Sequence, residues 1–268
     1  MRLLINGGLP HDSGKTRFGL TLISLLREVG INLFPMKPVA GHNGWYSYST
    51  LTRSMELGVL VGNDALNYYE NTGESIEEIN PFAVLFFPVD PESIERNFPY
   101  YLSLMDRGYP VMMRMTVEQK RMYLRAPSRL ISSSMRDVLE RLISRFDPVP
   151  VEEREMWRLI ENSGEIVHNN VISALNRHKN VLIESYNNAS CPTYYPPGVD
   201  YVITIVPGRA YVFDGREYSK FLSLSSLPPW LIKTEEAFKF LKPETYTLEL
   251  ATSRSPALID FLIKKEII

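Results

Sequence analysis

Short apolar runs alternate along the chain with longer stretches in which apolar residues recur every three or four positions. The first run, at 2–6, is continuously apolar at its centre, as expected for a strand covered on both faces of a sheet. In the stretch 16–29 the apolar positions fall on one helical face, and Gly30 stands where a C-terminal cap belongs. A second strand is predicted at 31–39. Strand, helix and strand in so short a stretch predict a parallel pair with a right-handed crossover.

The alternation continues to the end of the chain. Helices are predicted at 52–71 (with a break at 62–64), 92–104, 128–145, 152–177, 235–241 and 256–265, and strands at 109–116, 180–185, 201–206 and 246–251. Strands that alternate with helices are typical of a three-layer α/β fold. We therefore expect a single domain over residues 1–268, with a mostly parallel central sheet and a mostly helical insertion at about 90–178.

The composition argues against several classes of partner and site. Of the 268 residues, 44% are hydrophobic and 22% are charged, which is the balance of a soluble globular protein. The 29 basic and 31 acidic residues leave a net charge of −2, which argues against nucleic-acid and anionic-membrane partners. A single cysteine, Cys191, excludes an internal disulfide and a thiolate zinc cluster. No apolar run is long enough to span a bilayer or to act as a signal peptide, so we expect a cytoplasmic protein.

A loop rich in turn residues separates the first predicted strand from the first predicted helix. Its sequence, Gly8-Leu9-Pro10-His11-Asp12-Ser13-Gly14-Lys15-Thr16, has the form G-x5-G-K-T, one residue longer than the common phosphate-loop pattern. Such a loop aims backbone N–H groups and the positive end of a helix dipole at an anion. Lys15 would reach the terminal phosphates of a nucleotide and Thr16 would bind Mg²⁺. The alternative is a chance Gly-Lys-Thr at a helix start. The candidate nucleotide-binding residues are Gly8, Asp12, Ser13, Gly14, Lys15 and Thr16.

Four further segments follow the loop in chain order: Lys37-Pro38-Val39-Ala40, Asn63-Asp64-Ala65-Leu66, Asn80-Pro81-Phe82 and Val181-Leu182-Ile183-Glu184. Together with the loop and its acidic Asp12, they resemble motifs of the dethiobiotin synthetase family, in the deviant branch of P-loop NTPases. The matches cover the N-terminal third of the chain and one later strand. The resemblance implies the three-layer P-loop NTPase fold and a homodimer.

The resemblance also implies a reaction. Members of the family use MgATP to phosphorylate a carbamate or carboxylate acceptor, and ring closure or amide formation follows. By this resemblance Thr16, Asp64 and Glu184 would surround Mg²⁺, Lys15 would stabilise the transferring phosphoryl group, and Lys37 would place the small-molecule acceptor. Lys15 and Lys37 are therefore the candidate catalytic residues. We expect Mg²⁺ as the cofactor and ATP as a substrate.

Each of the three downstream residues also has a reading from the sequence alone. Glu184 directly follows an apolar run, at the carboxyl end of a strand where open α/β sheets bind ligands, although a solvated strand-end carboxylate fits too. Asp64 could instead cap the helix that follows it. Lys37 precedes a proline that holds it extended, but it could equally be a surface lysine.

The chain departs from the family pattern directly after two of these segments, Lys37-Pro38-Val39-Ala40 and Val181-Leu182-Ile183-Glu184. Gly41 stands where the family has serine, and Ser185-Tyr186-Asn187-Asn188 replaces a glycine-rich run after the metal-binding glutamate. These departures favour a changed acceptor on a retained nucleotide site. Two other functions stay open: a nucleotide-switched regulatory or assembly ATPase, and a small-molecule kinase. The sequence does not choose between ATP and GTP.

A local excess of positive charge runs from Arg107 to Arg129 in a chain whose net charge is −2. Its arginines could close on phosphates as a lid, or they could form the solvated face of a strand and a helix. The second reading is favoured.

Overall fold

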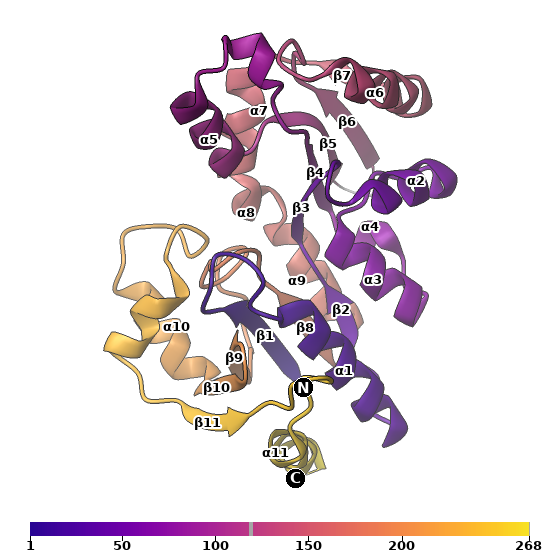
Figure 1. Cartoon of the computed structure of the whole chain (residues 1–268). Helices are drawn as coiled ribbons and strands as arrows, with labels where there is room; N and C mark the ends of the chain where they lie inside the picture. Colours follow the sequence, from indigo (N-terminus) through magenta and orange to yellow (C-terminus); the bar gives the residue numbers. More distant parts are fainter. Residues whose placement is uncertain (118–119, 268) are drawn as a thin grey trace. The chain divides into compact units, whose positions relative to one another are not determined.

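The computed structural model describes residues 1–117 and 120–267, and the chain folds into two compact units. The first unit comprises Met1–Val39, Asn71–Glu74 and Gly164–Ile268, and the second comprises Ala40–Glu70 and Ser75–Ser163. In Figure 1 the chain is coloured by residue number, so the segments of each unit can be followed from indigo at the N-terminus to yellow at the C-terminus. Each unit has its own sheet, so each is described by itself.

The first unit contains a six-stranded sheet in the order β11-β10-β9-β1-β8-β2. Its strands are β1 (Arg2–Gly7), β2 (Phe34–Met36), β8 (Val181–Glu184), β9 (Tyr201–Val206), β10 (Arg209–Asp214) and β11 (Glu244–Thr247). The strands β2, β8, β1 and β9 are parallel, whereas β10 runs antiparallel to β9 and to β11. The strand β8 is fully buried and β1 is buried after its first residue, as expected for parallel strands that are covered on both faces.

Helices of the first unit cover this sheet. They are α1 (Lys15–Glu28), α8 (Ser163–Ile166, whose first residue belongs to the second unit), α9 (His168–Arg177), α10 (Gly215–Ser223), the 3₁₀ helix η2 (Thr234–Lys239) and α11 (Pro256–Ile267). Helix α1 packs on β1, β8 and β9 through its buried face, which includes Phe18, Leu22 and Leu26. The predicted amphipathic helix is therefore confirmed, with its apolar face on the sheet.

The strand order shows a feature that the sequence could not reveal. The predicted parallel relation of β1 and β2 holds, but β8 lies between them (Figure 1) and pairs with both. The register aligns Ile5 with Glu184 and Met36 with Ile183. A segment from late in the chain thus brings its last residue, Glu184, to the carboxyl edge of β1 and β2, where open α/β sheets bind ligands.

The second unit contains a five-stranded sheet in the order β3-β4-β5-β6-β7. Its strands are β3 (Val39–Asn43), β4 (Phe82–Phe86), β5 (Pro110–Val117), β6 (Lys120–Arg125) and β7 (Val149–Pro150). Its helices are α2 (Tyr48–Leu57), α3 (Asn63–Thr72, whose last residues belong to the first unit), α4 (Ile76–Ile79), the 3₁₀ helix η1 (Pro91–Ile94), α5 (Phe98–Arg107), α6 (Ser133–Phe146) and α7 (Glu153–Glu161). The strands β4, β5 and β6 are antiparallel, and a cluster of buried apolar side chains packs around them.

The sheets of the structure differ from the single central sheet that the sequence predicted. The α/β class is confirmed, but the described residues form two mixed sheets rather than one central sheet. The expected helical insertion at about 90–178 contains β5, β6 and β7 as well as helices, and the second unit already begins at Ala40. The strands β4 and β6 escaped prediction for different reasons. A short apolar run such as β4 has no periodicity, and β6 is an exposed, basic strand.

The basic segment divides between the surface and the core of the second unit. Lys120 and Arg121 lie exposed on β6, as the favoured reading predicted, but Arg114 on β5 is fully buried. The guanidinium of Arg114 donates to Leu60 O at 2.6 Å, to Thr116 Oγ1 at 2.6 Å and to Asn80 O. Burial lowers the pKa of Arg114 to about 10, so the side chain stays charged at neutral pH.

Arg114 should stabilise the second unit because it satisfies three buried acceptors at once. We expect Arg114→Met to lower the free energy of unfolding by about 3 kcal/mol, since it leaves those acceptors without a donor. Arg114→Lys should not restore stability, because an ammonium cannot reproduce the planar fork of the guanidinium. Urea unfolding of the full chain checks this, with the exposed Arg158→Met as the control that leaves stability unchanged.

Candidate phosphate-binding site

The loop between β1 and α1 has the backbone geometry of an anion cradle. Gly14 adopts a left-handed conformation (φ 89°) directly before α1, and it has no side chain that could cap the helix. The first helical hydrogen bond runs from Phe18 N to Gly14 O at 3.0 Å. The backbone N–H groups of the first turn therefore have no acceptor within the helix, and helix N-termini of this kind are the places where proteins commonly bind phosphate.

The start of the loop is held close to the sheet. Gly8 N donates to Ile205 O at 3.0 Å, and a Cβ on Gly8 would lie 2.5 Å from Val206 Cγ1. Only a glycine allows so close an approach to β9. Asp12, another predicted nucleotide-binding residue, is exposed and also left-handed, with φ 52°. The loop thus makes two left-handed turns within three residues, at positions 12 and 14.

The predicted phosphate lysine, Lys15, folds back beneath this loop and is largely buried. Its Nζ donates to Ser13 Oγ at 3.1 Å and to Asn187 O at 2.8 Å. A Cβ on Gly7 would lie 2.5 Å from Ser13 Oγ and 2.7 Å from Lys15 Nζ. Gly7 and Asn187 therefore shape the site although sequence reasoning did not select them. The signal for Gly7 was present, since it directly precedes the motif.

The carboxylate of Glu184 joins three of the predicted residues. Its Oε1 accepts a hydrogen bond from Thr16 Oγ1 at 2.9 Å and from Lys37 Nζ at 2.6 Å. Lys37 Nζ also donates to Ser185 O at 2.9 Å. The pairing of β8 with β1 and β2 explains this meeting, because Lys37 follows β2 and Thr16 opens α1 at the same sheet edge. The hydroxyl of Thr16, the ammonium of Lys37 and the carboxylate of Glu184 thus lie together, and their roles toward a metal ion and an acceptor stay predictions.

Glu184 and Lys37 form a buried ion pair, with side chains 0% and 3% exposed. Removing two charges from water costs several kcal/mol each, so such a pair persists only with short contacts and further hydrogen bonds. Both conditions hold here, since Thr16 and the Ser185 carbonyl supply the further bonds. The reading of Lys37 as a solvated surface lysine is wrong, and so is the reading of Glu184 as a solvated carboxylate.

The donor set at Glu184 fits a hard cation. A hydroxyl and a carboxylate oxygen are ligands that Mg²⁺ accepts, with phosphate oxygens and waters completing its octahedron. Among residues 1–117 and 120–267, no group of three or more His, Cys, Asp or Glu side chains could hold a metal ion by itself.

The third predicted metal ligand, Asp64, belongs to the second unit. It lies in the first turn of α3, where its negative charge also favours the helix N-terminus. Burial lowers the pKa of His42 on β3 and the charge of Asp64 opposes this shift, so the two side chains lie in one region of that unit. The metal role of Asp64 stays a prediction.

No protein-family model, no curated protein and no solved structure matches this sequence or its fold. The residues described, moreover, include no helix that is long and apolar enough to cross a membrane.

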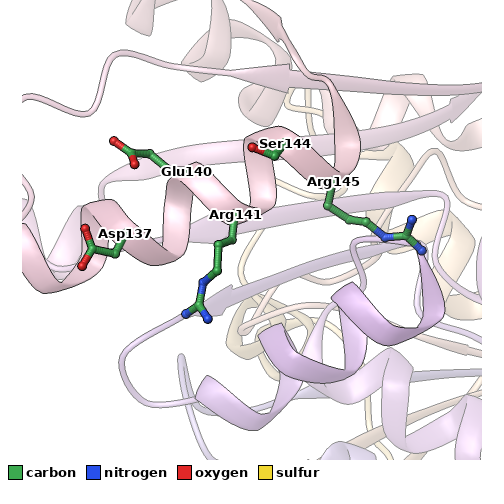
Figure 2. Close-up of a pocket in the computed structure, with 5 residues that line it drawn as sticks. All are labelled: Asp137, Glu140, Arg141, Ser144 and Arg145. Carbon is green, nitrogen blue, oxygen red and sulfur yellow. The ribbon is translucent and has the colours of Figure 1, made fainter.

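A hollow of about 830 Å³ lies in the second unit (Figure 2). Its lining residues are Asp137, Glu140, Arg141, Ser144 and Arg145, all on α6. Arg145 is already engaged, because its Nε donates to Met55 O at 3.2 Å. The hollow is lined by a single surface helix. Unlike the site at Glu184, it does not bring together side chains from different elements of the chain.

The buried ion pair leads to a test of stability. Lys37→Met leaves the carboxylate of Glu184 buried without its cation, and we expect the free energy of unfolding to fall by about 3 kcal/mol. The double variant Lys37→Met/Glu184→Gln should regain most of this loss, because glutamine is neutral and still accepts from Thr16. Urea unfolding of the two variants and the wild type measures the effect. A double variant no more stable than the single one would contradict the ion-pair account.

His42 leads to a test of pH dependence. The imidazole is buried, and neither ring nitrogen has a hydrogen-bond partner among the residues described. Burial lowers its pKa from 6.5 to about 4, against the opposing charge of Asp64. The unfolded chain therefore binds a proton more tightly, and stability present above pH 6.5 is lost as the pH falls toward 4. We expect a loss of about 2 kcal/mol at pH 5.

The variant His42→Leu isolates this contribution, since it removes the titrating group and keeps the site apolar. The difference in unfolding free energy between pH 7.5 and pH 5 should shrink by the same amount in the variant. An equal pH dependence in both proteins would show that His42 is not the responsible group.

Proposed function

We propose that this protein binds MgATP at the 8–16 loop and transfers its γ-phosphoryl group to a carboxylate or carbamate acceptor, as enzymes of the dethiobiotin synthetase family do. One observation carries the proposal: Lys15 and Thr16 at the start of α1 lie beside the buried Lys37–Glu184 pair at one sheet edge. Cationic and hydroxyl groups there suit phosphates, and the carboxylate suits their metal ion.

Each group has a role in this reaction. The N–H groups of the first turn of α1 and the Lys15 ammonium neutralise negative charge on the phosphates, which is the main demand of phosphoryl transfer. Thr16 and Glu184 would hold Mg²⁺, which supplies further charge neutralisation when bound. Lys37 places an ammonium directly beside the carboxylate, where it can orient an anionic acceptor oxygen toward the phosphoryl group.

A second function, a nucleotide-switched ATPase, is favoured by the segment after Glu184. Instead of glycines, this segment contains Asn187, whose carbonyl accepts from the phosphate lysine, and Asn188, whose carbonyl accepts from Thr234 N at 2.8 Å. The nucleotide site is thereby tied to a distant part of the chain, as a switch requires. A small-molecule kinase would differ from both functions by releasing a phosphorylated product without ring closure.

Lys15→Ala tests the phosphate loop itself. It removes the ammonium from an otherwise unchanged loop, and we expect ADP formation from MgATP to fall at least about 100-fold. Lys220→Ala, an exposed lysine paired with Glu217, is the matched control and should retain full activity. Undiminished nucleotide turnover in Lys15→Ala would overturn the phosphate-binding assignment.

The same assay distinguishes the functions. ADP formed only with diaminononanoate and bicarbonate would establish dethiobiotin synthetase activity. Slow ADP formation that ignores both additions and is lost in Lys15→Ala would favour the switch.

A further inference from the structure

The ammonium of Lys15 already uses most of its donors inside the protein. A lysine has three N–H donors, and two of them serve Ser13 Oγ and Asn187 O. At most one donor remains, whereas a phosphate-loop lysine reaches both the β- and γ-phosphates. One internal contact must therefore be replaced when a nucleotide binds. Ser13 is part of the loop itself, two residues from Lys15, so the Asn187 carbonyl is the contact that gives way.

The Asn187 carbonyl is not free to turn. Asn187 adopts a left-handed conformation with φ 44°, which asparagine tolerates better than most residues. The next carbonyl, Asn188 O, accepts from both Thr234 N at 2.8 Å and Thr234 Oγ1 at 2.9 Å. The Asn187 carbonyl belongs to the peptide that leads into Asn188, so anchoring the Asn188 carbonyl leaves only the φ and ψ of Asn188 and the ψ of Asn187 through which that peptide can turn.

Further bonds fasten the same two segments together. Ser190 N donates to Ile232 O at 2.8 Å, and Ala189 bridges Lys233 in an antiparallel pair. The side chain of Asn188 also donates to Glu235 Oε2 at 3.2 Å. All of these residues belong to the first unit, and Thr234 is fully buried at the start of η2.

We propose that Thr234 is a positioning residue for the phosphate lysine. Through Asn188 it holds the Asn187 carbonyl on Lys15, in the place that a nucleotide phosphate oxygen takes. Thr234 thereby lowers the affinity for nucleotide, and nucleotide binding loosens the junction between the segments 187–190 and 232–235. This inference rests on the proposed nucleotide site.

Thr234→Val provides the test, because valine keeps the shape of threonine and removes only the hydroxyl donor. We expect calorimetric titration with a non-hydrolysable MgATP analogue, which keeps the γ-phosphate, to give a roughly threefold lower Kd, since part of one hydrogen bond of restraint is lost. Thr234→Ser keeps the hydroxyl and should bind as the wild type does. Asn188→Ala, which removes the bond to Glu235 at the surface, should shift Kd in the same direction if Thr234→Val fails to fold.

Amide hydrogen exchange gives a readout that a purely structural role would not move. The Thr234 and Ser190 N–H groups should exchange faster in the complex with the MgATP analogue than in the free protein. Unchanged exchange, or an unchanged or higher Kd in Thr234→Val and Asn188→Ala, would overturn the inference. If the wild type does not bind the MgATP analogue, or if Lys15→Ala binds it equally well, the proposed nucleotide site fails and this inference fails with it.

Discussion

The pairing of β8 between β1 and β2 is the constraint on which the candidate site depends. Parallel strands end at a common edge, so the residue that closes β8 must lie beside the residues that follow β1 and β2. Glu184 therefore meets Thr16 and Lys37 although the three are far apart in the sequence. A shift of one residue in this register would turn the carboxylate to the other face of the sheet.

In this cluster a single oxygen atom accepts two side-chain hydrogen bonds. Glu184 Oε1 accepts from both Thr16 and Lys37, so the hydroxyl and the ammonium fix the carboxylate in one orientation. The arrangement is costly to bury and needs all of its partners, which is the usual condition of a polar network in a core. An ion pair with a purely structural role would not need Lys15 packed against Gly7 beside it, nor the helix α1 without a side-chain cap at its N-terminus. That combination is what favours a ligand site over a purely structural network.

Much of the site could be predicted from the sequence because it lies in local patterns. The strand β1, the helix α1 and the loop between them follow from apolar periodicity and turn residues, and Glu184 follows from its place after an apolar run. The second sheet could not be predicted. Its strands β4 and β6 lack any alternation that separates them from loops, and long-range pairing leaves no mark on local sequence. The contact of Asn187 with Lys15 was hidden for the same reason, since a backbone carbonyl carries no residue-type signal.

The residues after Glu184 form a segment held by its own hydrogen bonds, in place of the glycine-rich run of the dethiobiotin synthetase motif. A glycine-rich run leaves open space in which a ligand can approach the backbone. Here Ser185 N donates to Ile5 O at 2.8 Å and Ser185 Oγ donates to Ala189 O at 2.8 Å, which closes the segment on itself. The carbonyl of Asn187 then faces the phosphate lysine rather than open space. A segment held in this way leaves less open space beside Glu184 than a glycine-rich run would leave, and this is the physical basis for proposing a different acceptor or a protein partner.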